Sequence, residues 1–290
     1  MNIGIIGLGL IGGSIAKEIR TRSLGTISVM GVDKSKEHAS RALELGLVDR
    51  IVDFDELISE AELLIIAVPV NIIESLLPQV LDAISSEQVV IDVGSTKSDI
   101  CTHVSDHPKR HRFVAAHPLA GTEYSGPDAA LMNLFTGKKN IICEREKSDP
   151  DALAHAERIF EFLGMHNIYL NSSEHDKHMA YVSHLSHIIS FALSDTVLDI
   201  EKDEKHIFNL ASTGFASTAR LAKCNPVTWT AIFEKNPDYL SEAIDAYIKH
   251  LRNYKKLVED RNWTGMHRAI SNSNDITRVL NGIKLNPVKS

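Results

Sequence analysis

Hydrophobic residues in the first half of the chain gather in short runs that alternate with helical patterns. The apolar runs predict strands at residues 2–6, 27–32, 63–68, 89–93, 113–116 and 139–143. The segments between them predict helices at residues 12–21, 36–45, 72–83, 97–105 and 127–134, and a helix at 151–163 with an edge strand at 167–170 completes the series. Because the strands are continuously apolar and alternate with helices, they indicate a mainly parallel sheet covered on both faces.

After Asn171 the strand-like runs end and only helical patterns follow. These patterns predict helices at residues 173–201, 214–223, 226–234, 237–259 and 265–282. Ser173 and Asp176 have the spacing of a capping box and are predicted to begin the first of these helices. A chain of 290 residues has the length of two domains. We therefore predict an α/β domain over residues 1–171 and an all-α domain over residues 172–290.

The balance of charge excludes one class of function. The chain carries 31 Lys and Arg residues against 38 Asp and Glu residues, a formal charge of −7, which argues against a nucleic-acid-binding protein. A small anionic substrate is still compatible, because a site can be locally positive in an acidic protein. The three cysteines are widely separated, so neither a disulfide framework nor a cysteine zinc site is expected. The N-terminus has no signal-peptide pattern and the apolar run at 63–70 is far shorter than a membrane span, so we expect a cytoplasmic protein without a membrane segment.

Residues 7–12 read GLGLIG and match the GxGxxG fingerprint of dinucleotide-binding proteins. The motif follows the first predicted strand and opens the first helix, where the backbone can approach a pyrophosphate closely. Asp33 ends the second strand, 21 residues after the last glycine, where a carboxylate binds ribose hydroxyls and repels a 2′-phosphate. The sequence therefore predicts NAD as the cofactor, and a glycine-rich turn without a cofactor is the alternative. The loop residues expected to hold the cofactor are Gly7, Gly9, Leu10, Ile11 and Gly12.

Ligands of such sheets bind outside the carboxyl ends of the strands, where three further segments end. Val68 closes one strand and is expected to contact the cofactor, while Ser95 follows a second strand and His117 a third. A neutral imidazole at His117 is well matched to taking a proton from an alcohol, and Ser95 could bind the same hydroxyl. The structural alternatives are a buried histidine at 117 without a catalytic role and a helix cap at Ser95.

Four histidines lie within thirteen residues at the start of the helical half, at positions 175, 178, 184 and 187. His184 and His187 share a helical face, but no carboxylate stands at the HExxH spacing of a zinc site, so no metal site is predicted. We interpret His175 and His178 as polar positions of an ordinary helix. His184 and His187 precede an apolar run and are expected to face the cleft.

Arg220 stands between an alanine and a leucine, and the next charged residue along its predicted helix is Lys223. A lone arginine in such a setting is unusual for a solvated face. It is either the partner of a structural ion pair or a fork that binds a substrate carboxylate.

Five segments together resemble the prephenate dehydrogenase family. They cover residues 7–14, 92–97, 117–123, 182–187 and 214–229, and they occur in the family's order. The HPLAGTE and SHLSH stretches are more specific than the glycine fingerprint. The resemblance implies an N-terminal Rossmann-type dinucleotide-binding domain followed by an all-α C-terminal domain through which two chains form a homodimer.

The resemblance also implies an activity and a role for each site residue. The family converts prephenate and NAD to 4-hydroxyphenylpyruvate, carbon dioxide and NADH in tyrosine biosynthesis. His117 would take the proton of the ring 4-hydroxyl as hydride leaves the same carbon, and Ser95 would orient that hydroxyl. Arg220 would bind a substrate carboxylate and His187 the pyruvyl side chain. The positions that match the family's pocket lining are Thr122, Glu123 and Trp229.

Three alternatives remain from the sequence. An arogenate dehydrogenase would act on a substrate with an amino group in place of the keto group. A β-hydroxyacid dehydrogenase would use a lysine of the helical domain, such as Lys177 or Lys223, as its acid–base group. A non-catalytic NAD-sensing protein would leave the set of polar residues unused. We expect neither the fused chorismate mutase domain nor the tyrosine-sensing domain that some family members carry.

Overall fold

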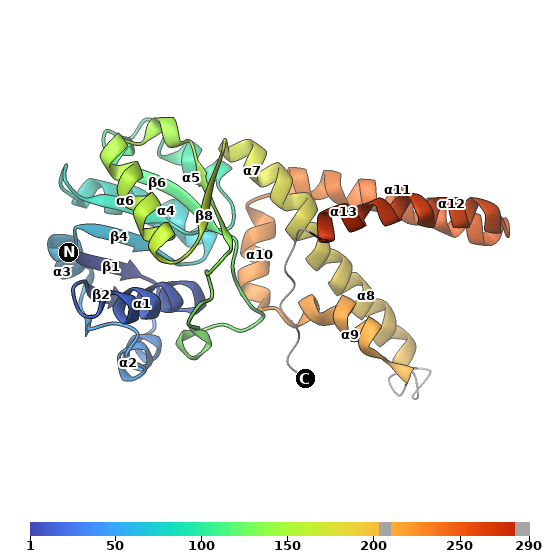
Figure 1. The fold of residues 1–290 in the computed structure, drawn as a ribbon, viewed down its shortest axis with the longest axis horizontal. Helices are drawn as coiled ribbons and strands as arrows, with labels where there is room; N and C mark the ends of the chain where they lie inside the picture. Colours follow the sequence, from blue (N-terminus) through green and yellow to red (C-terminus); the bar gives the residue numbers. More distant parts are fainter. Residues whose placement is uncertain (203–209, 282–290) are drawn as a thin grey trace. The chain divides into compact units, whose positions relative to one another are not determined.

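The computed structural model describes residues 1–202 and 210–281 of the chain. Residues 1–240 form one compact unit, and the chain from Ser241 onward forms a second. The first unit contains an eight-stranded sheet with helices packed on its two faces (Figure 1). The strands are β1 (Asn2–Ile6), β2 (Ser28–Val32), β3 (Arg50–Ile51), β4 (Leu63–Ile66), β5 (Val89–Asp92), β6 (Phe113–Pro118), β7 (Lys139–Cys143) and β8 (His166–Leu170).

Helices connect the strands and then continue alone to the end of the described chain. Those between strands are α1 (Leu10–Ser23), α2 (Lys36–Glu44), α3 (Phe54–Glu60), α4 (Val70–Ala83), α5 (Ser98–His103) and α6 (Pro150–Phe162), with short 3₁₀ turns η1 (Arg110–Arg112), η2 (Pro127–Ala129) and η3 (Arg145–Lys147). After the sheet come α7 (Ser172–Met179), a π-helical turn η4 (Ala180–His184), α8 (Leu185–Glu201), α9 (Thr213–Ala219), a 3₁₀ turn η6 (Arg220–Lys223), α10 (Pro226–Glu234) and α11 (Pro237–Glu259).

The order of the strands reverses direction between β1 and β4. The order is β3-β2-β1-β4-β5-β6-β7-β8, and β1 pairs in parallel with both β2 and β4. The chain therefore builds the sheet outward in one direction from β1 and in the other direction from β4. In open parallel sheets, the point where the order reverses is where ligands bind. β7 runs antiparallel to β6, and β8 is parallel to β7.

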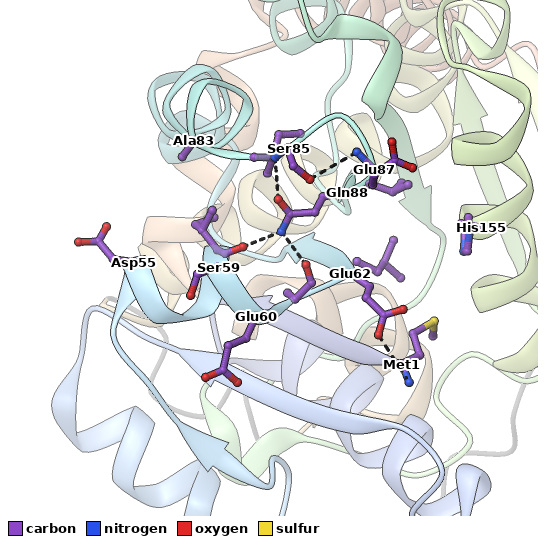
Figure 2. A pocket seen from close by; sticks show the side chains of 15 residues that line it. Met1, Asp55, Ser59, Glu60, Glu62, Ala83, Ser85, Glu87, Gln88 and His155 are labelled. Atoms are coloured by element: carbon purple, nitrogen blue, oxygen red, sulfur yellow. Dashed lines mark hydrogen bonds and ion pairs between the residues drawn. The ribbon is translucent and has the colours of Figure 1, made fainter.

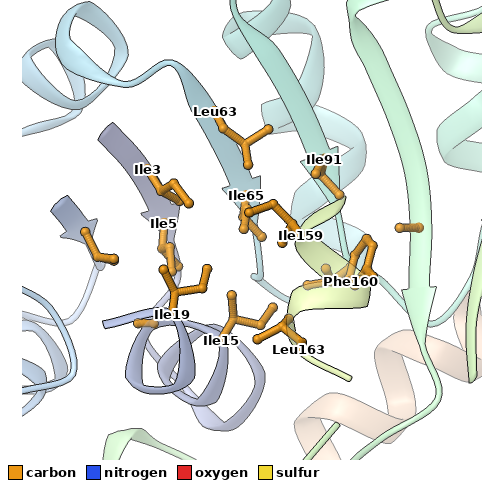
Figure 3. Packing of buried hydrophobic residues seen from close by; sticks show 14 of the residues in the cluster. Ile3, Ile5, Ile15, Ile19, Leu63, Ile65, Ile91, Ile159, Phe160 and Leu163 are labelled. Carbon is orange, nitrogen blue, oxygen red and sulfur yellow. The ribbon is translucent and has the colours of Figure 1, made fainter. Parts of the chain in front are cut away.

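Alternating strand residues fill two hydrophobic cores, one on each face of the sheet. Figure 3 shows Ile3 and Ile5 of β1 beside Leu63 and Ile65 of β4, packed against α1 and α6. The residues between them, such as Leu64, face the other way and pack with α3, α4 and α5. This period-2 alternation explains why β4 is apolar at every position, since both faces of the central sheet are buried.

The structure contradicts one predicted helix and contains two elements that were not predicted. The segment 127–134 is not a helix: only η2 forms, and Ala130, Leu134 and the following Phe135 reach the core from irregular backbone in which Asn133 has a positive φ of 59°. The short strand β3 and the helix α3 were not predicted, since a strand of two residues gives no period-2 signal.

The helical half departs from prediction in detail. The helix predicted from 173 forms as α7 and α8 with η4 between them, and Asn171, not Ser173, caps it by accepting a 2.7 Å hydrogen bond from the Glu174 N–H. The helix predicted at 214–223 ends at Ala219 and continues as η6. α10 and α11 have the predicted bounds.

The second unit contains the remainder of α11, followed by α12 (Trp263–Ser273), a 3₁₀ turn η7 (Asn274–Ile276) and α13 (Thr277–Leu280). Asn262 caps α12 by accepting a hydrogen bond of 2.8 Å from the Gly265 N–H. A hydrogen bond of 3.0 Å joins Tyr254 of α11 to Ser273 of α12. The last residue of the helix predicted at 265–282 lies outside the described residues. Within the described ranges, none of the helices has the length and apolar character needed to cross a membrane.

Candidate active site

Two adjoining hollows open at the carboxyl ends of the parallel strands. One, of about 310 Å³, lies over the loop after β1 and the end of β4. The other, of about 440 Å³, lies between the end of β6 and the helices α8 and α10. Both hollows share a wall, so a ligand in one would lie beside a ligand in the other. The residues of that wall are Ser95, Ala120, Gly121, Thr122, Glu123, Cys224, Trp229 and Ile232.

The glycine loop has the shape that a dinucleotide requires. Gly7 has a positive φ of 97°, and a side chain there would lie 2.6 Å from the Ala67 carbonyl oxygen. A side chain at Gly12 would collide with the Gly7 carbonyl oxygen. The helix α1 can therefore lie this close to the loop only because position 12 is a glycine. At Gly9, in contrast, no atom lies within 4 Å of the place of a side chain. The backbone of the loop thus faces open space at the N-terminus of α1, where free N–H groups suit a pyrophosphate.

Asp33 is fixed behind this loop by two backbone hydrogen bonds. Its carboxylate accepts from the Leu8 N–H at 2.8 Å and from the Ser35 N–H at 2.8 Å. Each oxygen keeps a further lone pair with which to accept a ribose hydroxyl. The residues predicted for the cofactor therefore divide into two groups. Gly9, Leu10, Ile11 and Val68 line the hollow, whereas Gly7, Gly12 and Asp33 shape the loop behind it.

His117 lies at the end of β6 and lines the second hollow. Its side chain is largely buried, and its Nδ1 lies 2.8 Å from Nε2 of His175. His175 is fully buried on α7, and its Nδ1 lies 2.7 Å from Oδ1 of Asp176. The interpretation of His175 as an ordinary polar helix position is therefore wrong: it points inward, because position 175 lies on the face of α7 that packs on the sheet domain. His178 is exposed on the same helix.

Asp176 also holds the segment that carries Ser95. Its Oδ1 accepts a 2.8 Å hydrogen bond from the Lys97 N–H and its Oδ2 one of 2.7 Å from the Ser98 N–H, so it caps α5 from another helix. The structural alternative of a helix cap at Ser95 is wrong, because Lys97 stands at the N-cap position of α5. The Ser95 side chain is thereby left to line both hollows.

A buried ion pair lies beneath these residues. Lys97 and Asp92 are both fully buried, and the Lys97 ammonium is bonded to the Asp92 carboxylate. The Asp92 carboxylate also accepts a 2.9 Å hydrogen bond from the Gly94 N–H and a backbone hydrogen bond from Ala116. Burial raises the pKa of Asp92, and the positive charge of Lys97 opposes that rise. The pair fixes the turn between β5 and α5 on which Ser95 stands.

The helical side of the second hollow carries an aromatic cluster. The His187 ring stacks on Trp229 with their centroids 3.3 Å apart, and His184 packs edge-on against Trp229 at 6.2 Å. His187 Nδ1 donates to the Ser183 carbonyl at 2.9 Å, so its Nε2 carries the lone pair in the neutral ring. The π-helical turn η4 lies between α7 and α8 and ends at His184. Such turns often mark functional sites.

Arg220 begins η6 and lines the second hollow. Its guanidinium lies 3.6 Å from the Glu123 carboxylate, and about half of the Arg220 side chain is exposed. Thr122 and Trp229 line the same hollow. The structure thus brings together all the residues predicted to contact the substrate. Lys177 and Lys223, offered as acid–base groups of a β-hydroxyacid dehydrogenase, are exposed and contribute to neither hollow.

Burial controls the protonation of the histidines in this site. It lowers the pKa of His117 well below the ordinary value of 6.5, and the neighbouring His175 and Lys97 lower it further. Burial also lowers the pKa of His175, against the effect of Asp176, and that of His184 to about 4. These histidines are therefore neutral near pH 7, the form in which a ring nitrogen accepts a proton.

Acid should destabilise the protein through these same histidines. Below the unfolded-state pKa of 6.5 the unfolded chain binds a proton at position 184, while the folded chain does not until about pH 4. The unfolded state then holds more protons, so the free energy of unfolding falls as the pH falls through this window. His184→Leu should make the slope shallower by up to about 1.4 kcal/mol per pH unit, measured by urea unfolding. The exposed His178→Leu is the control, and equal slopes in the two variants would contradict this assignment.

A further hollow, of about 790 Å³, lies at the opposite edge of the sheet, at the amino ends of β1, β4 and β5 (Figure 2). Four of its lining residues are acidic, and two of these are paired with a cation: Glu60 with Arg50, and Glu62 with the Met1 ammonium at 3.6 Å. A dianionic ligand would be repelled there. The acidic residues that line it are Asp55, Glu60, Glu62 and Glu87.

The doubly wound sheet, the glycine loop at its switch point and a buried histidine beside that loop define an NAD-dependent oxidoreductase with a Rossmann-type domain. Residues 15–169 match the family model described as prephenate dehydrogenase, nucleotide-binding domain, and residues 171–272 match the one described as prephenate dehydrogenase, dimerization domain. The chain belongs to the prephenate dehydrogenase family. The predicted family and fold class are thereby confirmed.

Individual relatives agree with this assignment. The chain is 31% identical over 274 residues to a prephenate dehydrogenase of Bacillus subtilis, an alignment that covers 93% of this chain and 74% of the relative. The crystal structure of A. aeolicus prephenate dehydrogenase in complex with hydroxyphenyl propionate and NAD⁺ is 30% identical, with a TM-score of 0.87 over 96% of this chain and 97% of that one. Synechocystis arogenate dehydrogenase is 29% identical, with a TM-score of 0.77 over 97% of this chain and 100% of that one.

Proposed function

We propose that this protein catalyses the NAD-dependent oxidative decarboxylation of prephenate to 4-hydroxyphenylpyruvate, a step of tyrosine biosynthesis. The observation that carries the proposal is the convergence of a neutral histidine, a serine and an arginine on a hollow that shares a wall with the glycine-loop hollow. Hydride transfer needs the reacting carbon held against the nicotinamide, and adjoining hollows provide that arrangement. The family and the relatives support this choice of reaction.

His117 is the proposed base. Its unprotonated ring nitrogen takes the proton of the ring 4-hydroxyl while the hydrogen on the same carbon leaves as hydride, and the C–O bond becomes a carbonyl. The ring carboxylate then leaves as carbon dioxide, and its electron pair makes the ring aromatic as a phenolate. The proton held by His117 returns to that oxygen, so no net proton is released. Ser95 is the proposed partner that orients the hydroxyl.

NAD, when bound, accepts the hydride. Gly9, Leu10, Ile11 and Val68 are the proposed contacts, because they line the first hollow. Asp33 is held in place to accept both ribose hydroxyls, and its charge would repel a 2′-phosphate. Gly7 and Gly12 have no room for a side chain and act through the path of the backbone.

The substrate end of the cleft binds the two carboxylates and the side chain of prephenate in this proposal. Arg220 binds a carboxylate and exchanges its contact with Glu123 for one with the substrate. His187, held by Ser183 and Trp229, contacts the pyruvyl side chain. Thr122, Glu123 and Trp229 form the wall of the pocket.

A kinetic assay tests the proposal directly. NADH formation would be followed with prephenate and with arogenate, each with NAD and with NADP. We expect turnover with prephenate and NAD. Faster turnover of arogenate would assign the chain to the alternative substrate, with which the Synechocystis relative agrees in name. Absence of turnover on both, with NAD still bound, would contradict the proposed activity.

Replacing Arg220 by alanine should mainly raise KM for prephenate. A hydrogen bond to a charged group is worth about 1.5–3 kcal/mol, so we expect a rise of about 10- to 100-fold. Steady-state kinetics would measure it, with Lys223→Ala as the matched control, because Lys223 is an exposed cation on the same turn. An unchanged KM in Arg220→Ala would show that the guanidinium binds no substrate carboxylate.

We also propose a homodimer in the cytoplasm, with a domain boundary at residue 171. The match to a dimerization domain supports association through the helical half. α8 supports it as well, since it is rich in apolar residues but buries only His187 and Ser190. Among its exposed apolar side chains are Leu198 and Ile200.

A further inference from the structure

His117 is joined to a chain of hydrogen bonds that leads away from the substrate hollow. Its Nδ1 lies 2.8 Å from Nε2 of His175, whose Nδ1 lies 2.7 Å from Oδ1 of Asp176. His175 and Asp176 are almost completely buried. Neither lines a hollow at the carboxyl edge, so neither reaches a substrate.

Which atom donates in each of these hydrogen bonds follows from the protonation state of Asp176. Asp176 accepts from the Lys97 and Ser98 N–H groups, and these bonds stabilise its ionised form. Burial raises the pKa of Asp176, but the bonds from His175 and Ser98 outweigh it and hold the pKa below its ordinary value. An ionised carboxylate only accepts, so Nδ1 of His175 carries the proton that it donates. Nε2 of neutral His175 is then a lone pair and accepts from Nδ1–H of His117.

We propose that His175 and Asp176 are positioning residues that hold His117 in the tautomer with Nδ1 protonated, leaving its Nε2 free to take the substrate proton. The proposal rests on the proposed role of His117 as the base. When His117 takes the proton, the new positive charge lies one imidazole away from an ionised carboxylate. The pair therefore stabilises the imidazolium as well as the tautomer, as a third residue does in a catalytic triad.

Other charged and titratable groups around the pair oppose the positive charge or are already paired. Lys97 disfavours protonation of both histidines, but it is bonded to Asp92. His184 on η4 also disfavours a charge on His117. Asp176 is thus the carboxylate that favours a positive charge on the hydrogen-bonded histidine pair His117 and His175. We call these three residues the relay. The groups that act on the relay are Asp92, Lys97, Asp99, Cys143 and His184.

Asp176 connects the relay to Ser95, the residue proposed to orient the substrate hydroxyl. It bonds to the first N–H groups of α5, directly after the turn that carries Ser95. One carboxylate thereby fixes the base through His175 and the serine through the backbone. The separation of the base and the hydroxyl-binding serine is set by a helix of the other half of the chain.

His175→Phe tests the relay without removing the Asp176 cap. We expect kcat for prephenate to fall by about 10²- to 10⁴-fold, the range for loss of a correctly oriented base, with KM and the Kd of NAD within about twofold of the wild type. His175→Gln should have a kcat within about tenfold of the wild type, because its amide oxygen can lie near the position of His175 Nε2 and still accept from His117. His178→Phe, the same change at an exposed position of α7, is the control and should leave kcat unchanged.

A double variant separates positioning from structural support. In His117→Asn the base is absent, so adding His175→Phe should cost less than threefold more, since residues that act as one unit are not additive. A full further loss in that background would overturn the proposal, as would wild-type kcat in His175→Phe. If His175→Phe does not bind NAD, the wild-type tautomer of His117, measured from histidine ¹⁵N chemical shifts, decides the proposal.

A measurement without substrate keeps this proposal separate from the proposed reaction. Histidine ¹⁵N chemical shifts should show His117 protonated at Nδ1 in the wild type and a mixture of tautomers in His175→Phe. Protonation at Nε2 in the wild type would overturn the relay even if prephenate is turned over. The expected tautomer without turnover of prephenate would contradict the reaction and retain the hydrogen-bond chain.

Discussion

Replacing His117 by asparagine should lower kcat for prephenate by about 10²- to 10⁴-fold, the usual contribution of a general base. The amide nitrogen of asparagine lies near the place of Nδ1 and can still donate to His175, so the fold and the hydrogen bond behind the base should persist. The ring nitrogen that faces the hollow is lost. Steady-state measurement of NADH formation would give kcat. Titration of the variant with NAD would give the Kd of NAD, which we expect to be unchanged.

The matched control for this variant is His166→Asn, at an exposed position of β8 outside both hollows. It should leave kcat and KM unchanged. Wild-type kcat in His117→Asn would return His117 to the alternative of a buried structural histidine. A large loss of NAD affinity in His117→Asn would indicate instead that the variant disturbs the shared wall of the two hollows.

Replacing Lys97 by methionine should destabilise the protein by about 3–5 kcal/mol, the cost of removing one partner of a buried ion pair. The methionine fills most of the volume, but Asp92 is left with its charge buried and without a cation, and the Gly94 and Ala116 N–H groups remain as its donors. Urea unfolding at neutral pH would measure the loss as a fall in the transition midpoint at similar m-value.

The double variant Lys97→Met with Asp92→Leu is the control for this prediction. Removing both charges together leaves no unpaired group, so most of the stability should return, since well-packed apolar pairs often match buried ion pairs. If Lys97→Met alone costs less than about 1 kcal/mol, the pair contributes no more than an exposed one. In that case the turn that carries Ser95 would be held by the Asp176 cap alone.

The fold could be predicted from sequence to the extent that it depends on local pattern. The strands β1, β4 and β5 are continuously apolar because both faces are covered, and α10 and α11 begin with proline, which suits a first helical turn. The glycine loop was predictable because the positive φ of Gly7 and the close approach of Gly12 to the Gly7 carbonyl both lie within six residues of sequence. The segment 127–134 was not, because its apolar residues are held by the core and not by one helix.

The strand pattern made the site predictable only where a residue follows its own strand, whereas Arg220, His187 and Trp229 were expected from the family resemblance. His117 and Ser95 follow strands, and that position is enough to place them. His175 and Asp176 are fixed by partners 58 and 79 positions away, and the sequence around them looks like a polar helix. The adjacent pair His175-Asp176 was the one available signal, since a carboxylate next to a histidine can fix its tautomer.

The reversal of direction at β7 has a consequence for how the two ligands influence each other. Because β7 runs back antiparallel to β6, the twenty residues between them stay at the carboxyl edge and do not cross to the far side of the sheet. This one connection supplies Ala120 through Glu123 to both hollows. A ligand that orders this connection in one hollow bears the entropic cost of ordering it. The second ligand, binding in the other hollow, then does not bear that cost again. Cofactor and substrate should therefore bind with positive coupling of equal size in both directions, a property of the connection itself and independent of any contact between the two molecules.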